Sequence, residues 1–235
     1  MSDLCLYCHE ELIPQISWSA FFTKDVPFYL CENCTEQLEE IHGKICEICS
    51  RPLEGLDSQY VMGDRCYDCV RWEEDSNWQG CLRKNHSIYI YNDFLKELIS
   101  QFKFRRDYIL SKAFAEKIHR KLVPVHYNLL VPIPLSNERL YERGFNQSEA
   151  LIKAAGSEPT QLLHRIHSEK QSKKSRSERI HLEQVFQLKE NIDVTGKKIL
   201  LIDDIYTTGS TLRHAAKVLK KAGAEEISSL TLARG

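Results

Sequence analysis

Four Cys-x-x-Cys pairs occupy the first 81 residues of the chain, and no other sequence feature constrains the fold as strongly. Two residues between thiolates let both sulfurs of a tight turn face one tetrahedral ion, and four thiolates close a structural zinc shell. The pairs therefore predict structural zinc, in two sites. The expected ligands are Cys5, Cys8, Cys31, Cys34, Cys46, Cys49, Cys66 and Cys69.

The pairs also form an internal repeat, because CLYCHEEL and LCENC are followed by the similar strings CEICSRPL and RCYDC. The repeat favours two ribbons in series, with one zinc held by the first four cysteines and one by the next four. An interleaved arrangement stays open, since spacing alone does not say which pairs meet. Cys81 falls outside the pattern and is expected to be a buried small hydrophobe.

A disulfide framework is the structural alternative to zinc, and it needs an oxidising compartment. The N-terminal string MSDLCLYCHEEL has neither a basic start nor an apolar h-region. No run approaches the roughly 18 apolar residues of a membrane span. We therefore expect a cytoplasmic protein without membrane insertion, whose reduced cysteines bind metal.

Charge divides the chain at the same place as the cysteines. Residues 1–81 have 5 Lys and Arg against 16 Asp and Glu, a net charge of −11, whereas residues 82–235 have 27 against 17, or +10. We expect a cysteine-rich double zinc-ribbon-like domain at 1–81 and a second domain at 82–235. The acidic charge disfavours nucleic-acid binding by the zinc module and favours protein contacts.

The second domain alternates strand and helix patterns. Residues 88–104 favour a strand and then a helix, and a further helix is expected at about 110–122. NLLVPIPL predicts a buried strand, and SNERLYERGFNQ a loop that leads to a helix near Ser148. The C-terminal unit predicts a strand, a loop, a helix that ends near Gly223, and a last strand. This alternation predicts an α/β fold, a mainly parallel sheet flanked by helices.

The string ILLIDDIYTTGST, residues 199–211, has the most chemical content. Asp203 and Asp204 end a buried strand, where open α/β sheets place ligands. The following helix begins in a run of small hydroxyl residues and glycine, which suits a phosphate monoester. Adjacent carboxylates suit the vicinal hydroxyls of a sugar, directly or through a divalent ion. The string predicts a ribose 5-phosphate site, with phosphate contacts from Thr207, Thr208, Gly209, Ser210 and Thr211.

This string resembles the phosphoribosyl pyrophosphate (PRPP) signature of type I phosphoribosyltransferases. With the cysteine pairs, QFKF, LLVPIPLSNERLYERGFNQSEAL and SLTLARG, the chain is similar to the ComF family over nearly its whole length. The resemblance implies a phosphoribosyltransferase-like domain that binds PRPP with Mg²⁺, in which Asp203 and Asp204 are the catalytic pair. It also implies a cytoplasmic competence factor for DNA uptake in natural transformation. Its partners would be a ComFA-type helicase and the incoming single-stranded DNA.

The family pattern adds further expectations about ligand contacts. It implies a pyrophosphate-binding loop from Pro132 to about Arg143, in which Arg139 and Arg143 either bond phosphate oxygens or are surface charges. The following R-G-F-N-Q string offers the amides of Asn146 and Gln147 to a ligand.

Residues 164–186 occupy the position of a mobile hood over PRPP, with Ser168 and His181 departing from the pattern of relatives. Lys103, Arg105 and Arg106 form a basic patch, for which a solvated face and a phosphate contact both stay open.

Three functions remain open on the sequence. The first is the competence factor, which binds PRPP or a DNA 5′-phosphate within a protein complex. A second is an active transferase that moves ribose 5-phosphate from PRPP to an unidentified acceptor, for which no segment predicts a pocket. The third is a non-catalytic adaptor, which the intact Asp203 and Asp204 beside the small-residue loop disfavour.

Overall fold

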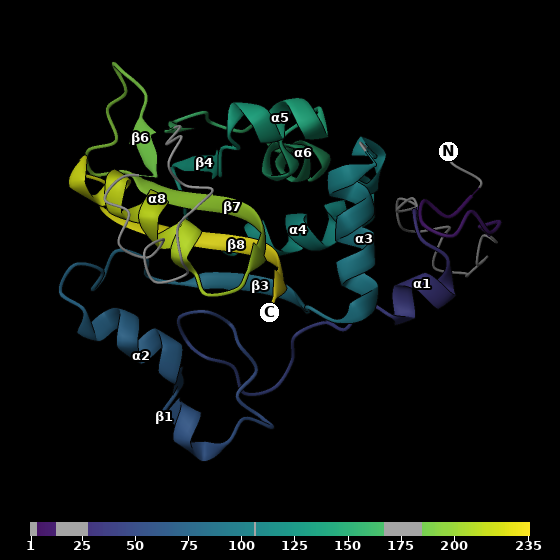
Figure 1. Ribbon diagram of the computed structural model, residues 1–235, viewed down its shortest axis with the longest axis horizontal. Coiled ribbons are helices and arrows are strands. Elements are labelled where there is room, and N and C mark those ends of the chain that lie inside the picture. The colour runs from purple at the N-terminus through teal and green to yellow at the C-terminus, as the bar shows by residue number, and fades with distance from the viewer. Residues whose placement is uncertain (1–3, 13–27, 106, 167–184) are drawn as a thin grey trace.

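A four-stranded sheet forms the centre of the molecule in the computed structural model, which describes residues 4–12, 28–105, 107–166 and 185–235 (Figure 1). Every neighbouring pair of strands is parallel, which confirms the predicted α/β fold. In spatial order the strands are β3 (Asn85–Ile90), β8 (Glu226–Arg234), β7 (Lys198–Tyr206) and β4 (Leu129–Pro132).

The sheet separates two hydrophobic cores. Successive residues of a strand face opposite sides, so Leu200 and Ile202 of β7 join one core while Ile199 and Leu201 join the other. The first core is covered by α3 (Asp93–Phe104), the 3₁₀ helix η3 (Tyr108–Phe114), α4 (Ala115–Leu122) and α6 (Gln147–Ala154). The second is covered by α8 (Ser210–Lys221) and by the antiparallel pair β5 (Leu163–Arg165) and β6 (Phe186–Leu188).

Two local predictions need correction. The helix expected at about 110–122 is split, because a 3₁₀ segment precedes α4. The stretch predicted as a loop contains α5 (Asn137–Arg143). Ser136 Oγ accepts a hydrogen bond from Arg139 N at 3.3 Å, and Gly144 ends the helix with a left-handed φ of 79°. These are ordinary start and stop signals for a helix, and the neighbouring prolines obscured them.

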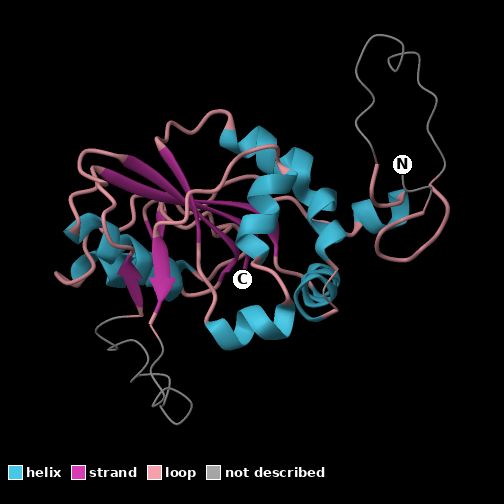
Figure 2. Cartoon of the chain, turned by 90° about the horizontal axis from the view of Figure 1, so that it is seen from above, coloured by secondary structure: helices cyan, strands magenta, loops and turns pink. Residues whose placement is uncertain are grey.

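The cysteine-rich region contacts the sheet domain in two separate places (Figures 1 and 2). Its first half contains α1 (Glu32–Glu36), beyond α3, and its second half lies beneath β3. The connecting segment follows the edge of β3, where Ile41 N donates to Ile88 O at 2.9 Å. The second half of the cysteine-rich region contains η2 (Ser58–Tyr60), β1 (Val61–Met62), β2 (Arg65–Cys66) and α2 (Tyr67–Glu74).

The division of the chain into domains 1–81 and 82–235 stays a prediction.

Across the described parts of the chain, no helix has both the length and the apolar content needed to cross a bilayer.

Candidate functional site

The predicted acidic pair and small-residue loop lie at one edge of the sheet. Since β4, β7 and β8 are parallel, their carboxyl ends meet at this edge, where open α/β sheets bind ligands. Asp203 and Asp204 belong to the last part of β7, and the loop of Thr207, Thr208 and Gly209 leads directly into α8. We call these three residues the phosphate loop.

The two carboxyl groups have different surroundings. Asp203 is partly buried, and its Oδ1 accepts hydrogen bonds from Ser148 Oγ at 3.3 Å and from Asp204 N at 3.0 Å. Burial and the charge of Asp204 raise the pKa of Asp203 to about 7, although these hydrogen bonds and the charge of Lys103 oppose the rise. Asp203 can therefore exchange a proton near neutral pH.

Asp204 is paired with a cation from another element. Lys103, in the last turn of α3, forms an ion pair with Asp204, and the two side chains are only 16% and 12% exposed. The suggestion that Lys103 belongs to a solvated basic face is therefore wrong. Arg105 is exposed, and Arg106 lies outside the described residues. A cation or sugar hydroxyl that approached the Asp204 carboxylate would therefore also come next to the Lys103 ammonium group.

The phosphate loop turns through a left-handed glycine just before α8 begins. Gly209 has a φ of 79°, and a Cβ there would collide with the Tyr206 ring, so only glycine fits. The first turn of α8 contains no acidic residue, and its first N–H groups have no acceptor within the helix, although Ser210 N donates to Thr208 Oγ1 at 3.4 Å. Thr207, Thr208 and Thr211 are exposed and Ser210 is partly exposed, so their hydroxyls are available to a ligand.

The two predicted arginines lie one turn apart on α5. Arg143 is partly buried, its Nη1 donates to Gln147 Oε1 at 2.8 Å, and its guanidinium lies 5.5 Å from the Phe104 ring centroid. Burial lowers the pKa of Arg143, while the charges of Asp204 and Asp203 act in the opposite direction. The charges of both aspartates thus act on Arg143, whereas Arg139, one turn earlier on the helix, is exposed.

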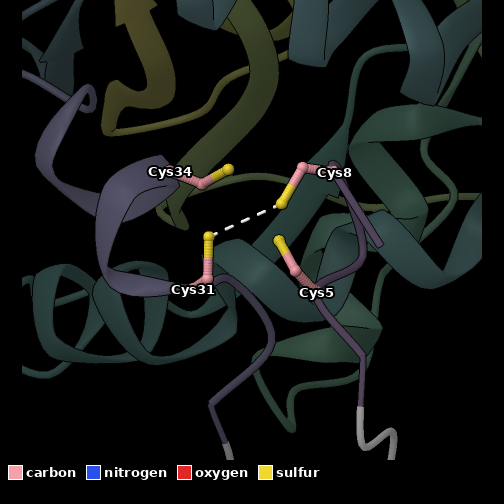
Figure 3. A group of neighbouring side chains, drawn as sticks. All are labelled: Cys5, Cys8, Cys31 and Cys34. Carbon is pink, nitrogen blue, oxygen red and sulfur yellow. Dashed lines mark hydrogen bonds between the residues drawn. The ribbon is translucent and has the colours of Figure 1, made fainter. Parts of the chain in front are cut away.

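The eight paired cysteines form two compact clusters in the sequential arrangement. Within each cluster the four sulfurs lie within 4.8 Å of one another, and Figure 3 shows the sulfurs of the first converging. Two sulfur–sulfur distances, Cys8–Cys31 at 3.5 Å and Cys49–Cys66 at 3.6 Å, are close to the roughly 3.8 Å expected around one tetrahedral Zn²⁺. Each cluster could therefore hold one metal ion. Cys81 lies outside both clusters and is buried, as expected.

Comparison with known proteins assigns the family. A family model described as "Phosphoribosyl transferase domain" matches residues 94–235. Competence protein ComFC of Bacillus subtilis (strain 168) is 40% identical, over 98% of this chain and 95% of that protein. The chain belongs to the ComFC family.

A second ComFC, from Streptococcus pneumoniae (strain ATCC BAA-255 / R6), is 34% identical over 98% of this chain and 99% of that protein. Among solved structures, a hypoxanthine phosphoribosyltransferase from Staphylococcus aureus aligns at 15% identity over 56% of this chain and 65% of that chain, with a TM-score of 0.33. The fold assignment rests on the strand order and on the family model.

The side-chain amides of Asn146 and Gln147, which we expected to contact a ligand, have other roles in the structure. Asn146 caps α6, since its Oδ1 accepts from Ser148 N at 2.9 Å and its Nδ2 donates to Ile133 O at 3.0 Å. Gln147 is buried and accepts from Arg143. Both amides therefore hold the chain around the site. The expected hood falls mostly on residues 167–184, outside the described residues, and with it Ser168 and His181.

Sequence reasoning missed the partners of the acidic pair. Ser148 directly follows the R-G-F-N-Q string, and Lys103 stands in the QFKF string between a buried and an exposed phenylalanine. Both strings contributed to the ComFC resemblance, so both were visible. Only the packing of α3 and α6 against the end of β7 shows that they reach the carboxyl groups.

Proposed function

We propose that this ComFC-family chain is a competence factor for DNA uptake in natural transformation, and that its phosphoribosyltransferase-like domain binds PRPP or a related 5′-phosphate. The name that both relatives carry, Competence protein ComFC, supports the biological role. The observation that supports the ligand is the acidic pair beside the phosphate loop, at the carboxyl edge of the sheet.

Each part of the site suits one part of PRPP. The phosphate loop, Ser210 and Thr211 offer N–H and hydroxyl donors to the 5′-phosphate. Asp203 and Asp204 suit the ribose hydroxyls, directly or through Mg²⁺, which would also neutralise the pyrophosphate. Arg143, on which the charges of both aspartates act, suits the pyrophosphate, and the exposed Arg139 adds positive charge one turn earlier on α5.

Calorimetry of the zinc-loaded protein with PRPP and Mg²⁺ tests this site. Wild-type protein should bind saturably, and the double variant Asp203→Ala/Asp204→Ala should show no binding. Glu225→Ala/Glu226→Ala is the matched control, because it removes an adjacent acidic pair where β8 begins, at the opposite edge of the sheet. Equal binding by the acidic-site variant and the control would reject the assignment.

In this function the tetracysteine clusters hold two structural zinc ions, and the cysteine-rich region is a docking surface for a ComFA-type helicase. Four thiolates around each zinc would add about −2 to a region that is already acidic. Pull-down of the helicase by the full-length protein should therefore weaken when acidic surface residues such as Asp57 and Asp64, both exposed, are changed to lysine. Undiminished capture would place the docking surface elsewhere.

The basic domain is the part that suits single-stranded DNA. Phe104 is 65% exposed beside Arg143, whereas Phe102 is fully buried and serves the core. An exposed aromatic ring next to a cation can stack a base, so Phe104→Ala should weaken binding of a labelled oligothymidine roughly tenfold. Tyr60→Ala, which removes an exposed ring from the acidic region, is the control. Equal losses in both variants would reject Phe104 as a stacking platform.

A transferase reaction is the second candidate, and the pKa of Asp203 favours it. A carboxyl group with a pKa of about 7 can accept a proton from an attacking nucleophile at neutral pH. Release of pyrophosphate from PRPP on addition of a nucleobase or amine, absent in Asp203→Asn, would support the reaction. Tight PRPP binding without release across a panel of acceptors would favour ligand binding alone.

A further inference from the structure

The second tetracysteine cluster lies directly behind the phosphate loop, and Arg234 joins the two. The guanidinium of Arg234 donates to Cys49 Sγ from Nε at 3.4 Å and from Nη2 at 3.5 Å. Its Nη1 donates to Thr207 O at 2.9 Å and to Tyr206 O at 3.2 Å. One buried side chain therefore bonds both a metal-binding sulfur and the backbone of the loop.

A second link comes from α2, the helix that follows Cys66. Trp72 Nε1 donates to Thr208 O at 3.0 Å. The neighbouring Glu73 pairs with Arg213 of α8 at 2.9 Å, and the Arg213 guanidinium lies 5.1 Å from the Trp72 ring centroid. The helix anchored by the cluster thus contacts both the phosphate loop and the helix that begins after it.

These contacts determine which groups the loop can offer to an anion. The carbonyl oxygens of Tyr206, Thr207 and Thr208 are each held by a donor, and Gly235 N adds a further bond to Tyr206 O at 3.0 Å. A carbonyl oxygen repels a phosphate, so a loop that binds one must turn its carbonyls away. Donors behind the loop keep three consecutive carbonyls in that orientation.

Arg234 depends on the arrangement of the cluster for its sulfur partner. The side chain is 4% exposed, and a buried guanidinium needs an anionic partner. Hydrogen bonds from a second layer of residues commonly orient metal ligands, and Arg234 has this position relative to Cys49. Loss of the metal would remove the arrangement of sulfurs that holds Arg234 in place.

We propose that Arg234 and Trp72 position the phosphate loop on the second tetracysteine cluster, and that this positioning sets the affinity of the loop for a phosphate monoester. The identity of the ligand rests on the proposed function, whereas the positioning does not. Arg234 and Trp72 are positioning residues, because they hold the loop from the side of the cluster.

Three single variants test the positioning. Arg234→Lys keeps the charge but lacks the planar fork that serves several acceptors at once, and Trp72→Phe removes only the N–H that bonds Thr208 O. Arg51→Gln is the matched control, because it breaks the Arg51–Asp68 pair within the same cysteine region. Trp72→Phe conserves most of the ring, so it keeps the test usable if Arg234→Lys folds poorly.

Two measurements are made on the full-length, metal-loaded protein: calorimetric affinity for PRPP with Mg²⁺, and amide hydrogen exchange of residues 206–212. We expect Arg234→Lys to weaken affinity by about 10- to 100-fold and Trp72→Phe by several-fold. Both should speed exchange in this segment at unchanged zinc content, and Arg51→Gln should match wild type in both measurements.

Each result separates this inference from the proposed function. If wild-type protein does not bind PRPP, the ligand assignment fails, and exchange of residues 206–212 alone decides the positioning. Wild-type exchange in both Arg234→Lys and Trp72→Phe would overturn it. So would equal acceleration by Arg51→Gln, because a general loss of stability would then explain the effect.

Discussion

The two tetracysteine clusters are alike in sequence but lie in different surroundings. Both have two Cys-x-x-Cys pairs in series, and both gather four sulfurs within 4.8 Å. In the first, Cys8 is exposed and the cluster packs with the core on the side of α3. In the second, all four cysteines are buried in the opposite core, beneath α8. The repeated spacing therefore fixes how the four sulfurs of each cluster are arranged, while the surroundings decide what each cluster supports.

The difference extends to the two halves of the candidate site. The first cysteine region contacts α3 through Tyr7, and the far end of α3 supplies Lys103 to Asp204. The second region bonds the phosphate loop itself, through Arg234 and Trp72. A change in the first cluster must reach the acidic pair through α3, whereas a change in the second cluster acts directly on the phosphate loop.

The largest expected effect is on stability, in a comparison of Cys49→Ser with Cys8→Ser. Loss of the Cys49 thiolate leaves Arg234 buried without its anion, and breaking a buried ion pair costs about 3 to 5 kcal/mol. Cys8 is exposed, so its loss should unfold only the local region and cost the sheet domain about 1 kcal/mol or less. Urea unfolding followed by far-ultraviolet circular dichroism measures both.

Zinc content measured on the same samples is the control, since each variant should lose one of two ions. Equal losses of stability in the two variants would contradict the comparison, because the clusters would then be equally integrated into the fold.

The next largest difference between the two clusters should be the rate at which each releases its metal ion. We expect two phases of similar amplitude when a chromogenic chelator is added, with rates at least about tenfold apart, because release from the buried cluster requires more of the structure to open. Cys8→Ser should remove the fast phase and leave the slow one. A single phase, or loss of the slow phase in Cys8→Ser, would show that burial does not control access.

Much of this arrangement was predictable because it depends on local pattern. The Cys-x-x-Cys spacing predicted the two clusters of four cysteines, and the run from Ile199 to Thr211 predicted β7, the loop and the start of α8 in the correct order. Hydrophobic periodicity predicts such elements because burial on a strand or helix repeats with its geometry. The helix α5 was missed because its start signal, Ser136, lies close to two prolines.

The long-range contacts were not predictable in the same way. Arg234 stands 185 residues from Cys49, and Trp72 stands 136 residues from Thr208. An arginine in a terminal strand and a tryptophan in an acidic helix have many possible partners, so residue type alone does not predict which partner each one contacts. Strand order alone places the end of β8 beside the end of β7 and so brings Arg234 to the loop.

A smaller effect, on how stability depends on pH, should report on the acidic pair separately from the phosphate loop. The pKa of Asp203 is raised to about 7 in the folded protein, from an ordinary value of 3.8, so folding favours the protonated form. Stability from this group is present below about pH 4 and is lost as the pH rises through 7. The full shift corresponds to about 4 kcal/mol, and solvent screening at this partly exposed carboxyl group should reduce it to about half. Asp203→Asn should therefore be about 2 kcal/mol more stable than wild type at pH 8, with no gain at pH 4.

Thermal unfolding between pH 4 and pH 8, without Mg²⁺ or PRPP, measures this difference. Trp72→Phe is the comparison variant and should keep the pH dependence of wild type, since it changes only the loop side. A parallel loss of pH dependence in Trp72→Phe would mean that the two halves of the site are not separate.

The smallest effect belongs to the first cluster's contact with α3. Tyr7 donates to Glu97 Oε2 at 2.8 Å, and its ring lies 4.9 Å from that of Phe94, so Tyr7→Phe removes one exposed hydrogen bond and keeps the packing. We expect a loss of about 0.5 kcal/mol in unfolding free energy and no change in affinity for PRPP. Calorimetry beside Trp72→Phe makes the decisive comparison, because both variants delete one donor near a cysteine cluster. If Tyr7→Phe weakened the ligand as much as Trp72→Phe, both clusters would support the site equally, and the contrast between them would fail.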